Sequence, residues 1–203
     1  IDTELKREVA VKVLPTYNGE DPTFDARFRQ EAQAVAKLSH PNILPIYDFG
    51  EDKGFAYIVT KLVAGGTLLS RMGKKHSLPE LLTFGSPLAG ALDYAHQQGI
   101  VHRDIKPSNV LLDPEAGPIL ADFGIARLLE SSVQLTRPGW ILGTPQYMSP
   151  EQALGQAVDN RSDVYALAIV LYELLLARPP FKSETPVATL LAQVHESVPS
   201  PTR

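Results

Sequence analysis

The sequence predicts an α+β fold in which a small β-rich part precedes a larger, mainly helical part. Short apolar runs rich in β-branched residues, typical of strands, lie at 9–14, 43–49 and 55–63. Apolar residues at helical spacing lie at 24–38, 79–96, 164–176 and 186–196. The change in pattern falls at Gly65-Gly66. We therefore expect residues 1–63 and 64–203 to form two units.

The bulk composition is that of an ordinary globular protein. The chain has 203 residues, 44% of them hydrophobic and 21% charged, which is enough to bury a core. A net charge of -4 gives no electrostatic footprint for nucleic acid or an anionic membrane. The absence of cysteine excludes disulfides and thiolate zinc sites and fits a reducing compartment. The apolar run 164–177 is interrupted by Glu173 and too short for a bilayer, so we expect a buried helix. We expect a cytoplasmic location for this domain only, and a membrane anchor elsewhere in the parent protein stays open.

The β-rich part contains two charged residues of interest. Lys12 lies inside the strand at 9–14, where a lysine ordinarily extends its ammonium group to water. Asp21-Pro22-Thr23 predicts a helix start, with an N-cap followed by proline. Glu31 lies at the margin of the apolar stripe of that helix, which is formed by Phe24, Phe28, Val35 and Leu38.

A hairpin and a long helix follow. The strands at 43–49 and 55–63 flank Glu51-Asp52-Lys53-Gly54, which predicts an antiparallel pair. The helix from Pro79 towards His96 contains Pro87, which removes a backbone hydrogen bond and costs about 3 kcal/mol in a regular helix. The helix is therefore expected either to kink at Pro87 or to begin later.

The stretch 102–124, HRDIKPSNVLLDPEAGPILADFG, carries the chemistry. Its apolar pieces at 110–112 and 119–121 flank a turn, which predicts a hairpin that brings Asn109 and Asp122 together beside Asp104. Carboxylate and amide oxygens suit Mg²⁺, and the ammonium group of Lys106 can offset phosphate charge. The stretch therefore predicts a site for a magnesium nucleotide.

These residues follow the order H-R-D-x-x-x-x-N and then D-F-G, which resembles the catalytic and magnesium loops of protein kinases. The chain is similar to Ser/Thr protein kinases, above all the eukaryotic-like kinases of bacteria. The resemblance implies a two-lobed fold and transfer of the γ-phosphoryl group of ATP to protein Ser/Thr hydroxyls. It implies that Asp104 orients the hydroxyl, Lys106 offsets charge, and Asn109 and Asp122 hold Mg²⁺.

The resemblance also assigns a phosphate contact and a regulatory helix. Lys12 corresponds to the lysine that holds the α- and β-phosphates, and Glu31 to its ion-pair partner on the regulatory helix. Residues 1–63 then correspond to a small lobe and 64–203 to a large lobe.

An adenine pocket is implied in the same way. Thr60 corresponds to the residue that guards the back of the pocket, and the backbone from Lys61 to Val63 to the hinge. The family usually has an acidic residue where Lys61 stands, and we expect the change to be tolerated because main-chain groups bind adenine there. Ala10 and Leu111 resemble the apolar pair on either side of the ring.

Residues 125–143 show no clear period and predict a long loop, which the resemblance identifies as the activation segment. Arg103 is expected to grip a phosphate on this loop. Thr136 is the first candidate to carry it, with Ser131 or Ser132 next.

The segment ends with GTPQYMSPE at 143–151, where Ser149-Pro150-Glu151 replaces the A-P-E of the family. Thr144 is expected to reach both Asp104 and Lys106. Ser162-Asp163 is expected to cap the helix at 164–176, and Asp163 is either a plain N-cap or a buried carboxylate that holds the catalytic-loop backbone.

The chain begins at Ile1 without the family's G-x-G-x-x-G loop, and no further helices follow residue 196. We therefore expect a domain truncated at both ends, with both lobes partial and little activity from residues 1–203 alone.

Two other functions stay open. A small-molecule phosphotransferase is disfavoured by Asp104-Ile105-Lys106-Pro107 and by residues 143–151, which seat a protein substrate in the family. A pseudokinase scaffold is disfavoured because every visible catalytic position is filled. The expected partners are proteins with Ser/Thr acceptors, and the resemblance leaves room for dimerisation that serves autophosphorylation.

Overall fold

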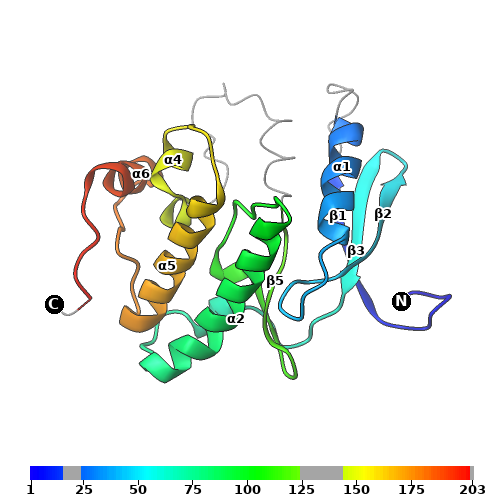
Figure 1. The fold of residues 1–203 in the computed structure, drawn as a ribbon, viewed down its shortest axis with the longest axis horizontal. Helices are drawn as coiled ribbons and strands as arrows, with labels where there is room; N and C mark the ends of the chain where they lie inside the picture. The colour runs from blue at the N-terminus through cyan, green and yellow to red at the C-terminus, as the bar shows by residue number, and fades with distance from the viewer. Residues whose placement is uncertain (16–23, 124–143, 202–203) are drawn as a thin grey trace.

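The computed structural model describes residues 1–15, 24–123 and 144–201, which form an α+β structure with two parts (Figure 1). The small part holds a three-stranded antiparallel sheet of order β1-β3-β2. Its strands are β1 (Val9–Pro15), β2 (Ile46–Asp52) and β3 (Phe55–Lys61). Helix α1 (Phe24–Ala36) packs against the sheet through a buried cluster of Leu14, Phe24, Phe28, Ala56 and Ile58. The helix start expected at 21–23 lies outside the described residues.

The sequence predicts that the second strand begins at Ile43, but in the structure it begins at Ile46. Ile43 instead forms a parallel bridge with Leu120 in the other part of the molecule. The buried side chain of Asn42 donates from Nδ2 to the carbonyl oxygen of Pro118, at 2.8 Å. The segment before β2 is therefore fastened to the large part, because its backbone groups find partners there.

The large part is mainly helical. Its helices are α2 (Leu78–Gln97), α4 (Pro150–Ala153), α5 (Asn160–Leu176) and α6 (Pro186–His195). A hairpin of β4 (Val110–Asp113) and β5 (Gly117–Leu120) lies between α2 and the small part (Figure 1). Single 3₁₀ turns lie at η1 (Leu68–Arg71), η2 (Pro107–Asn109) and η3 (Pro145–Tyr147). The main core joins α2 and α5 through fully buried side chains that include Leu88, Val170 and Leu174.

Helix α2 runs without interruption through Pro87, so the later start considered from the sequence is wrong. The helix begins at a capping box in which the Ser77 backbone N–H donates to Glu80, at 2.8 Å. Leu88 and Leu92, which follow the proline, are buried against the core. Their burial, at about 1.5–3 kcal/mol for each leucine, offsets the backbone bond that Pro87 removes.

Helix α5 begins one turn earlier than expected. Its N-cap is Asp159, whose carboxylate accepts from the Arg161 N–H at 2.9 Å, so Asp163 is not an N-cap. Asp163 lies instead in the first turn and is 1% exposed. Val164 was expected to join the core but is 59% exposed.

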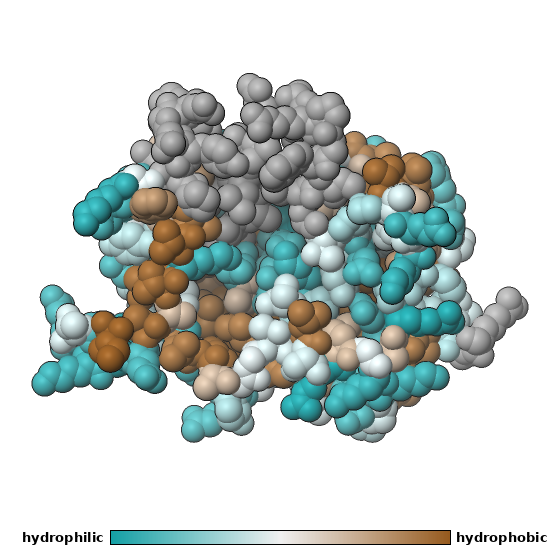
Figure 2. Space-filling view, turned by 180° about the vertical axis from the view of Figure 1, so that it is seen from behind, coloured by the Kyte–Doolittle hydropathy of each residue, from teal (hydrophilic) through white to brown (hydrophobic). Residues whose placement is uncertain are grey.

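Apolar surface remains on both sides of the molecule, over the sheet and over the side that carries α6 (Figure 2). Exposed apolar side chains of the sheet include Val11, Val13 and Phe55, and those on α6 include Val187 and Leu191. Among the described residues, no helix is both long and apolar enough to cross a lipid bilayer.

The chain passes from the small part to the large part through a close backbone contact. The Leu112 N–H donates to the Gly66 carbonyl oxygen at 2.9 Å, which joins the connecting segment to β4. A Cβ atom on Gly65 would lie 1.8 Å from the Leu112 carbonyl oxygen. Because that neighbour is backbone, it cannot swing away, and position 65 has no room for a side chain.

We predict that Gly65→Ala lowers the free energy of unfolding by about 1–3 kcal/mol, as overpacking does elsewhere. Gly90→Ala in α2 is the control: nothing lies within 4 Å of its added Cβ, and alanine favours the helix. Chemical denaturation checks both variants. Equal stability of Gly65→Ala and the parent would show that the contact with β4 is loose.

Candidate active site

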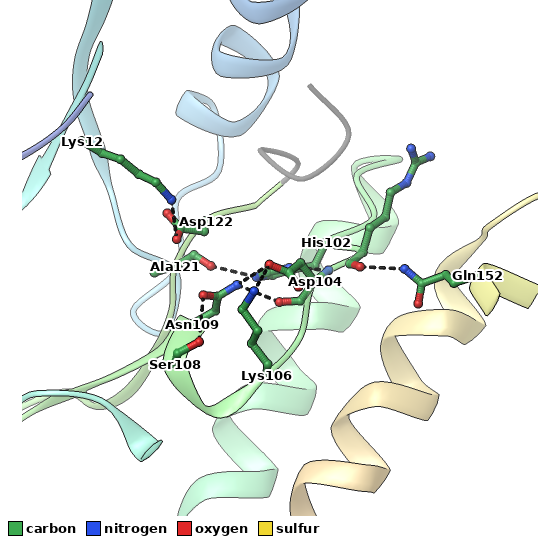
Figure 3. Close-up of polar contacts among 10 residues, drawn as sticks. Lys12, His102, Asp104, Lys106, Ser108, Asn109, Ala121, Asp122 and Gln152 are labelled. Carbon is green, nitrogen blue, oxygen red and sulfur yellow. Dashed lines mark hydrogen bonds and ion pairs between the residues drawn. The ribbon is translucent and has the colours of Figure 1, made fainter. Parts of the chain in front are cut away.

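The catalytic loop, residues 102–109, lies between α2 and β4. Side chains of this loop hydrogen-bond to Asp104 and fix its position (Figure 3). Lys106 Nζ donates to Asp104 Oδ2 at 2.6 Å. Asn109, which is buried, donates from Nδ2 to Asp104 Oδ2 at 2.9 Å and to the Asp104 carbonyl oxygen at 2.8 Å. The amide nitrogen of Asn109 is thus occupied, and its amide oxygen is the atom that can serve as a metal ligand.

The carboxylate of Asp163 on α5 accepts hydrogen bonds from the backbone of this loop. One carboxylate oxygen accepts from the His102 N–H at 2.8 Å and the other from the Arg103 N–H at 2.7 Å. His96 Nε2 lies 2.8 Å from the first oxygen. The interpretation of Asp163 as a buried carboxylate that grips the catalytic-loop backbone is confirmed. The contact with His96 was not predicted.

His102 links the catalytic loop to the segment before Asp122. Its ring is fully buried, Nε2 lies 2.9 Å from the Ala121 carbonyl oxygen, and the ring centroid lies 4.4 Å from that of Phe123. Because a carbonyl can only accept, Nε2 carries the proton, and Nδ1 accepts from the Asp104 N–H at 3.3 Å. The two predicted loops therefore form one hydrogen-bonded unit.

Lys12 and Asp122 meet across the two parts of the molecule (Figure 3). Lys12 Nζ lies 2.7 Å from Asp122 Oδ2, with the side chains 42% and 32% exposed. Asp122 has φ of 65°, in the left-handed region that aspartate enters more readily than most residues. The predicted ion pair between Lys12 and Glu31 stays a prediction, since the structure pairs Lys12 with Asp122.

A cavity of about 270 Å³ lies between the two parts, next to this ion pair. Apolar atoms from β1, β3 and β4 form much of its wall. Its lining includes every residue predicted for the adenine pocket and two predicted for phosphate and metal: Ala10, Lys12, Thr60, Lys61, Val63, Leu111 and Asp122. Glu31 lies on α1 and is not among the lining residues.

An ion pair that the sequence did not reveal involves Lys61, which lines this cavity. Lys61 Nζ lies 2.6 Å from Asp113 Oδ2, which joins the end of β3 to the end of β4. The other oxygen of Asp113 accepts from the backbone N–H groups of Glu115 and Ala116, both at 3.0 Å. The lysine and these N–H groups lower the pKa of Asp113 to about 2, and the carboxylate raises the pKa of Lys61. The only signal in the sequence was the basic residue at 61, where the family is usually acidic.

We predict that the ionised Asp113 carboxylate stabilises the folded protein and that this stabilisation is lost in acid. Its pKa in the folded protein, about 2, lies below the ordinary value of 3.8, so its contribution to stability is complete above that value and is lost as pH falls towards 2. The loss of unfolding free energy between pH 5 and pH 2 should therefore be smaller in Asp113→Asn. Denaturation curves across that range measure it.

Asp52→Asn, at the exposed last residue of β2, is the matched control and should follow the parent. An Asp113→Asn curve parallel to that of the parent would contradict the assignment.

Arg103 adopts φ of 69°, and its Nε is buried without a hydrogen-bond partner among the described residues. An unpaired buried donor of this kind requires an explanation, and an anionic partner would supply one. The residues proposed to carry a phosphate, Thr136, Ser131 and Ser132, lie outside the described residues. The role of Arg103 in binding a phosphate stays a prediction.

Residues 144–151, which follow the predicted activation segment, contact α5. The Tyr147 hydroxyl donates to Glu173 at 2.8 Å, and burial followed by this contact raises the pKa of Tyr147. Glu151 accepts a hydrogen bond from the Ser162 hydroxyl. Thr144 precedes the 3₁₀ turn η3, and its expected contacts with the catalytic loop stay a prediction.

The carboxylate oxygens of Asp122 and the amide oxygen of Asn109 are hard donors, which suit magnesium better than a soft transition metal. Mg²⁺ commonly takes one or two protein carboxylates and completes its octahedron with water and substrate phosphates. The Asp122 carboxylate and the Asn109 amide oxygen fit that requirement when a nucleotide supplies the remaining oxygens.

The fold and this site define a class. Residues 1–201 match the protein kinase domain family, and the chain belongs to that family. The particular relatives are bacterial. A probable serine/threonine-protein kinase of Streptomyces coelicolor is 46% identical over 98% of this chain, and the serine/threonine-protein kinase PrkC of Bacillus subtilis is 44% identical over 100%. The serine/threonine-protein kinase PknB of Mycobacterium tuberculosis is 42% identical over 96%.

This chain spans about a third of the length of these relatives: 31% of the Streptomyces and Bacillus proteins and 32% of the Mycobacterium protein. The match to the protein kinase domain family confirms the resemblance drawn from the two motifs and the α+β class of the fold.

Proposed function

We propose that the kinase domain to which these residues belong transfers the γ-phosphoryl group of magnesium-bound ATP to Ser and Thr hydroxyls of proteins, and that the assays below need a protein extended at both ends. One observation carries the proposal: Lys12 and Asp122 form an ion pair at a cavity that Ala10 and Leu111 also line. The Asp104 cluster is tied to the same place, because the Ala121 N–H, beside Asp122, donates to the Asn109 carbonyl oxygen at 2.9 Å. Phosphate, metal and acceptor groups thus converge beside one apolar pocket.

The residues have distinct roles in this reaction. Asp104 orients the acceptor hydroxyl and accepts its hydrogen bond, and Lys106 offsets charge on the phosphoryl group. Lys12 positions the α- and β-phosphates. Mg²⁺, held by Asn109 and Asp122 when bound, neutralises charge on the phosphate oxygens. Positioning and electrostatics supply most of the catalysis, which is why the short contacts around Asp104 matter.

The cavity suits an adenine ring. Ala10 and Leu111 come from opposite parts of the molecule and form apolar walls, and the backbone from Lys61 to Val63 offers hydrogen-bonding groups at the edge. The small side chain of Thr60 leaves depth behind the ring. The ion pair between Lys61 and Asp113 would hold this hinge backbone in place from the outside.

We further propose that residues 1–63 and 64–203 act as the small and large lobes and that the reaction takes place in the cytoplasm on protein substrates. Dimerisation for autophosphorylation stays a prediction.

We predict that Asp104→Asn and Asp122→Asn abolish transfer by different routes. Asp104→Asn should lower kcat by a factor of about 10²–10⁴ and leave the Kd for magnesium-bound ATP unchanged, because Asp104 touches the hydroxyl and not the metal. Asp122→Asn should also weaken nucleotide binding, since it removes a metal ligand and the partner of Lys12. Calorimetric titration and a phosphate-transfer assay separate the two effects.

Asp93→Asn, on the exposed face of α2, is the control and should behave as the parent. Parental binding of magnesium-bound ATP by both site variants would show that Asp122 does not hold the metal.

We predict that the phosphorylated residues are Ser and Thr. Lys106 lies 2.6 Å from Asp104, where it can contact the phosphoryl group as it reaches a short acceptor hydroxyl. Phosphoamino-acid analysis of labelled protein is the measurement, with Asp104→Asn as the background. Labelling mainly on tyrosine would exclude the proposed acceptor class.

A further inference from the structure

Gln152 of α4 contacts the catalytic loop directly, although nothing in the sequence motifs marked it. Its side chain points from α4 towards the loop (Figure 3), and its Nε2 donates to the Arg103 carbonyl oxygen at 2.8 Å. Residues 103 and 152 are far apart in the sequence, and the activation loop lies between them. The contact therefore joins the end of the substrate-facing segment to the residue that precedes Asp104.

The other half of the Gln152 amide is also occupied. Its Oε1 accepts from the backbone N–H of Ser149 at 3.0 Å and from the Ser149 hydroxyl at 3.2 Å, in a capping box that starts α4. Ser149 is fully buried. Only the amide nitrogen can donate to a carbonyl, and only the amide oxygen can accept from an N–H group. The hydrogen bonds therefore determine the orientation of the amide.

The carbonyl of Arg103 is a sensitive place for such a contact. Arg103 has φ of 69°, a left-handed conformation that is unfavourable for a non-glycine residue and persists only where the surroundings hold it. The Asp163 carboxylate accepts from the backbone N–H groups of His102 and Arg103. His102 and Asn109 hold the N–H and the carbonyl of Asp104.

Gln152 adds one more hydrogen bond to the backbone around Asp104, because its amide nitrogen donates to the carbonyl of the Arg103–Asp104 peptide. Rotation of that peptide plane would swing the Asp104 side chain. With the plane held, the Asp104 carboxylate keeps one direction relative to Lys106 and Asn109.

We propose that Gln152 is a positioning residue for phosphoryl transfer. It fixes the Arg103–Asp104 peptide plane, so the orientation of the Asp104 carboxylate depends on the position of α4. The inference rests on the role proposed for Asp104. It assigns the contact between α4 and the loop a part in catalysis beyond helix capping.

Gln152→Glu separates the two roles of the side chain. The carboxylate keeps the acceptor oxygen that Ser149 uses, and a negative charge is favourable in the first turn of a helix, so α4 should persist. The carboxylate has no donor and repels the Arg103 carbonyl. We expect kcat to fall roughly ten- to hundredfold at pH 8, the loss that a small misplacement of a catalytic group causes, with KM for ATP unchanged.

The loss should reverse with acid. A protonated carboxyl regains an O–H donor, and the neighbouring carbonyl and partial burial favour that form. The ratio of variant kcat to parent kcat should therefore rise as pH falls from 8 to 6. Gln156→Glu, four residues on and exposed, makes the same change of charge and should keep a constant ratio.

Other titrating groups cancel in this ratio, because the parent and the control contain them too. Within the described part of the chain, the charged and titratable groups on α4 and on the elements around it come from α4 itself, the catalytic loop, η3, α5 and α6: Glu151, His102, Arg103, Asp104, Lys106, Tyr147, Arg161, Asp163, Tyr165, Tyr172, Glu173 and His195. A second variant, Gln152→Met, preserves length but lacks both donor and acceptor. Its kcat should fall at every pH with no return in acid.

Amide hydrogen exchange of residues 102–104, followed by NMR without substrate, gives a readout independent of activity. Exchange at Asp104 should be several-fold faster in Gln152→Glu than in Gln156→Glu. If a parent protein extended at both ends transfers no phosphate, the proposed function fails, and the exchange rates still decide whether Gln152 holds the loop. If the parent is active, parental kcat at pH 8 together with unchanged exchange in Gln152→Glu would overturn the inference.

Discussion

The buried carboxylate of Asp163 joins the core of the large part to the backbone that presents Asp104. Its two oxygens accept from His102, Arg103 and His96, all at 2.7–2.8 Å. A buried charge without such donors would cost several kcal/mol. The packing of the helix that carries Asp163 and the position of the loop therefore stabilise each other. Core packing and catalytic geometry depend on the same contact.

The contacts around this anchor differ in exposure. His102, Asn109 and Asp163 are buried, so the geometry of the catalytic loop is rigid. The ion pair between Lys12 and Asp122 is partly open to water, where such pairs contribute little to stability. It joins two parts that, in the proposed function, admit and release a nucleotide. A weak contact at the mouth and strong contacts beneath it suit a site that opens without losing its arrangement of catalytic groups.

Local chemistry predicted the hairpin at 110–120 and the helices, because apolar spacing and turn residues act over short distances. It misplaced the start of α5, since Asp159 and Asp163 are both good capping residues and only burial distinguishes them. The motif spacing predicted the cluster around Asp104. The pair between Lys61 and Asp113 and the contact of Gln152 with Arg103 join distant residues and depend on how the chain folds back. No local pattern announces such contacts.

Arg103 combines a backbone that is held on two sides with a buried side-chain nitrogen that lacks a partner among the described residues. Its N–H is bonded to Asp163 and its carbonyl to Gln152, so its backbone is held from α5 and from α4 at once. Within the described part of the structure, Arg103 Nε is the buried side-chain polar atom that lacks a partner. An anion that paired with it would therefore add to a residue whose backbone is already rigid. Such an anion would not need to create the geometry of Asp104, because Asp163 and Gln152 already hold it. Its effect would be to bring the loop that carries it against the catalytic loop and α4.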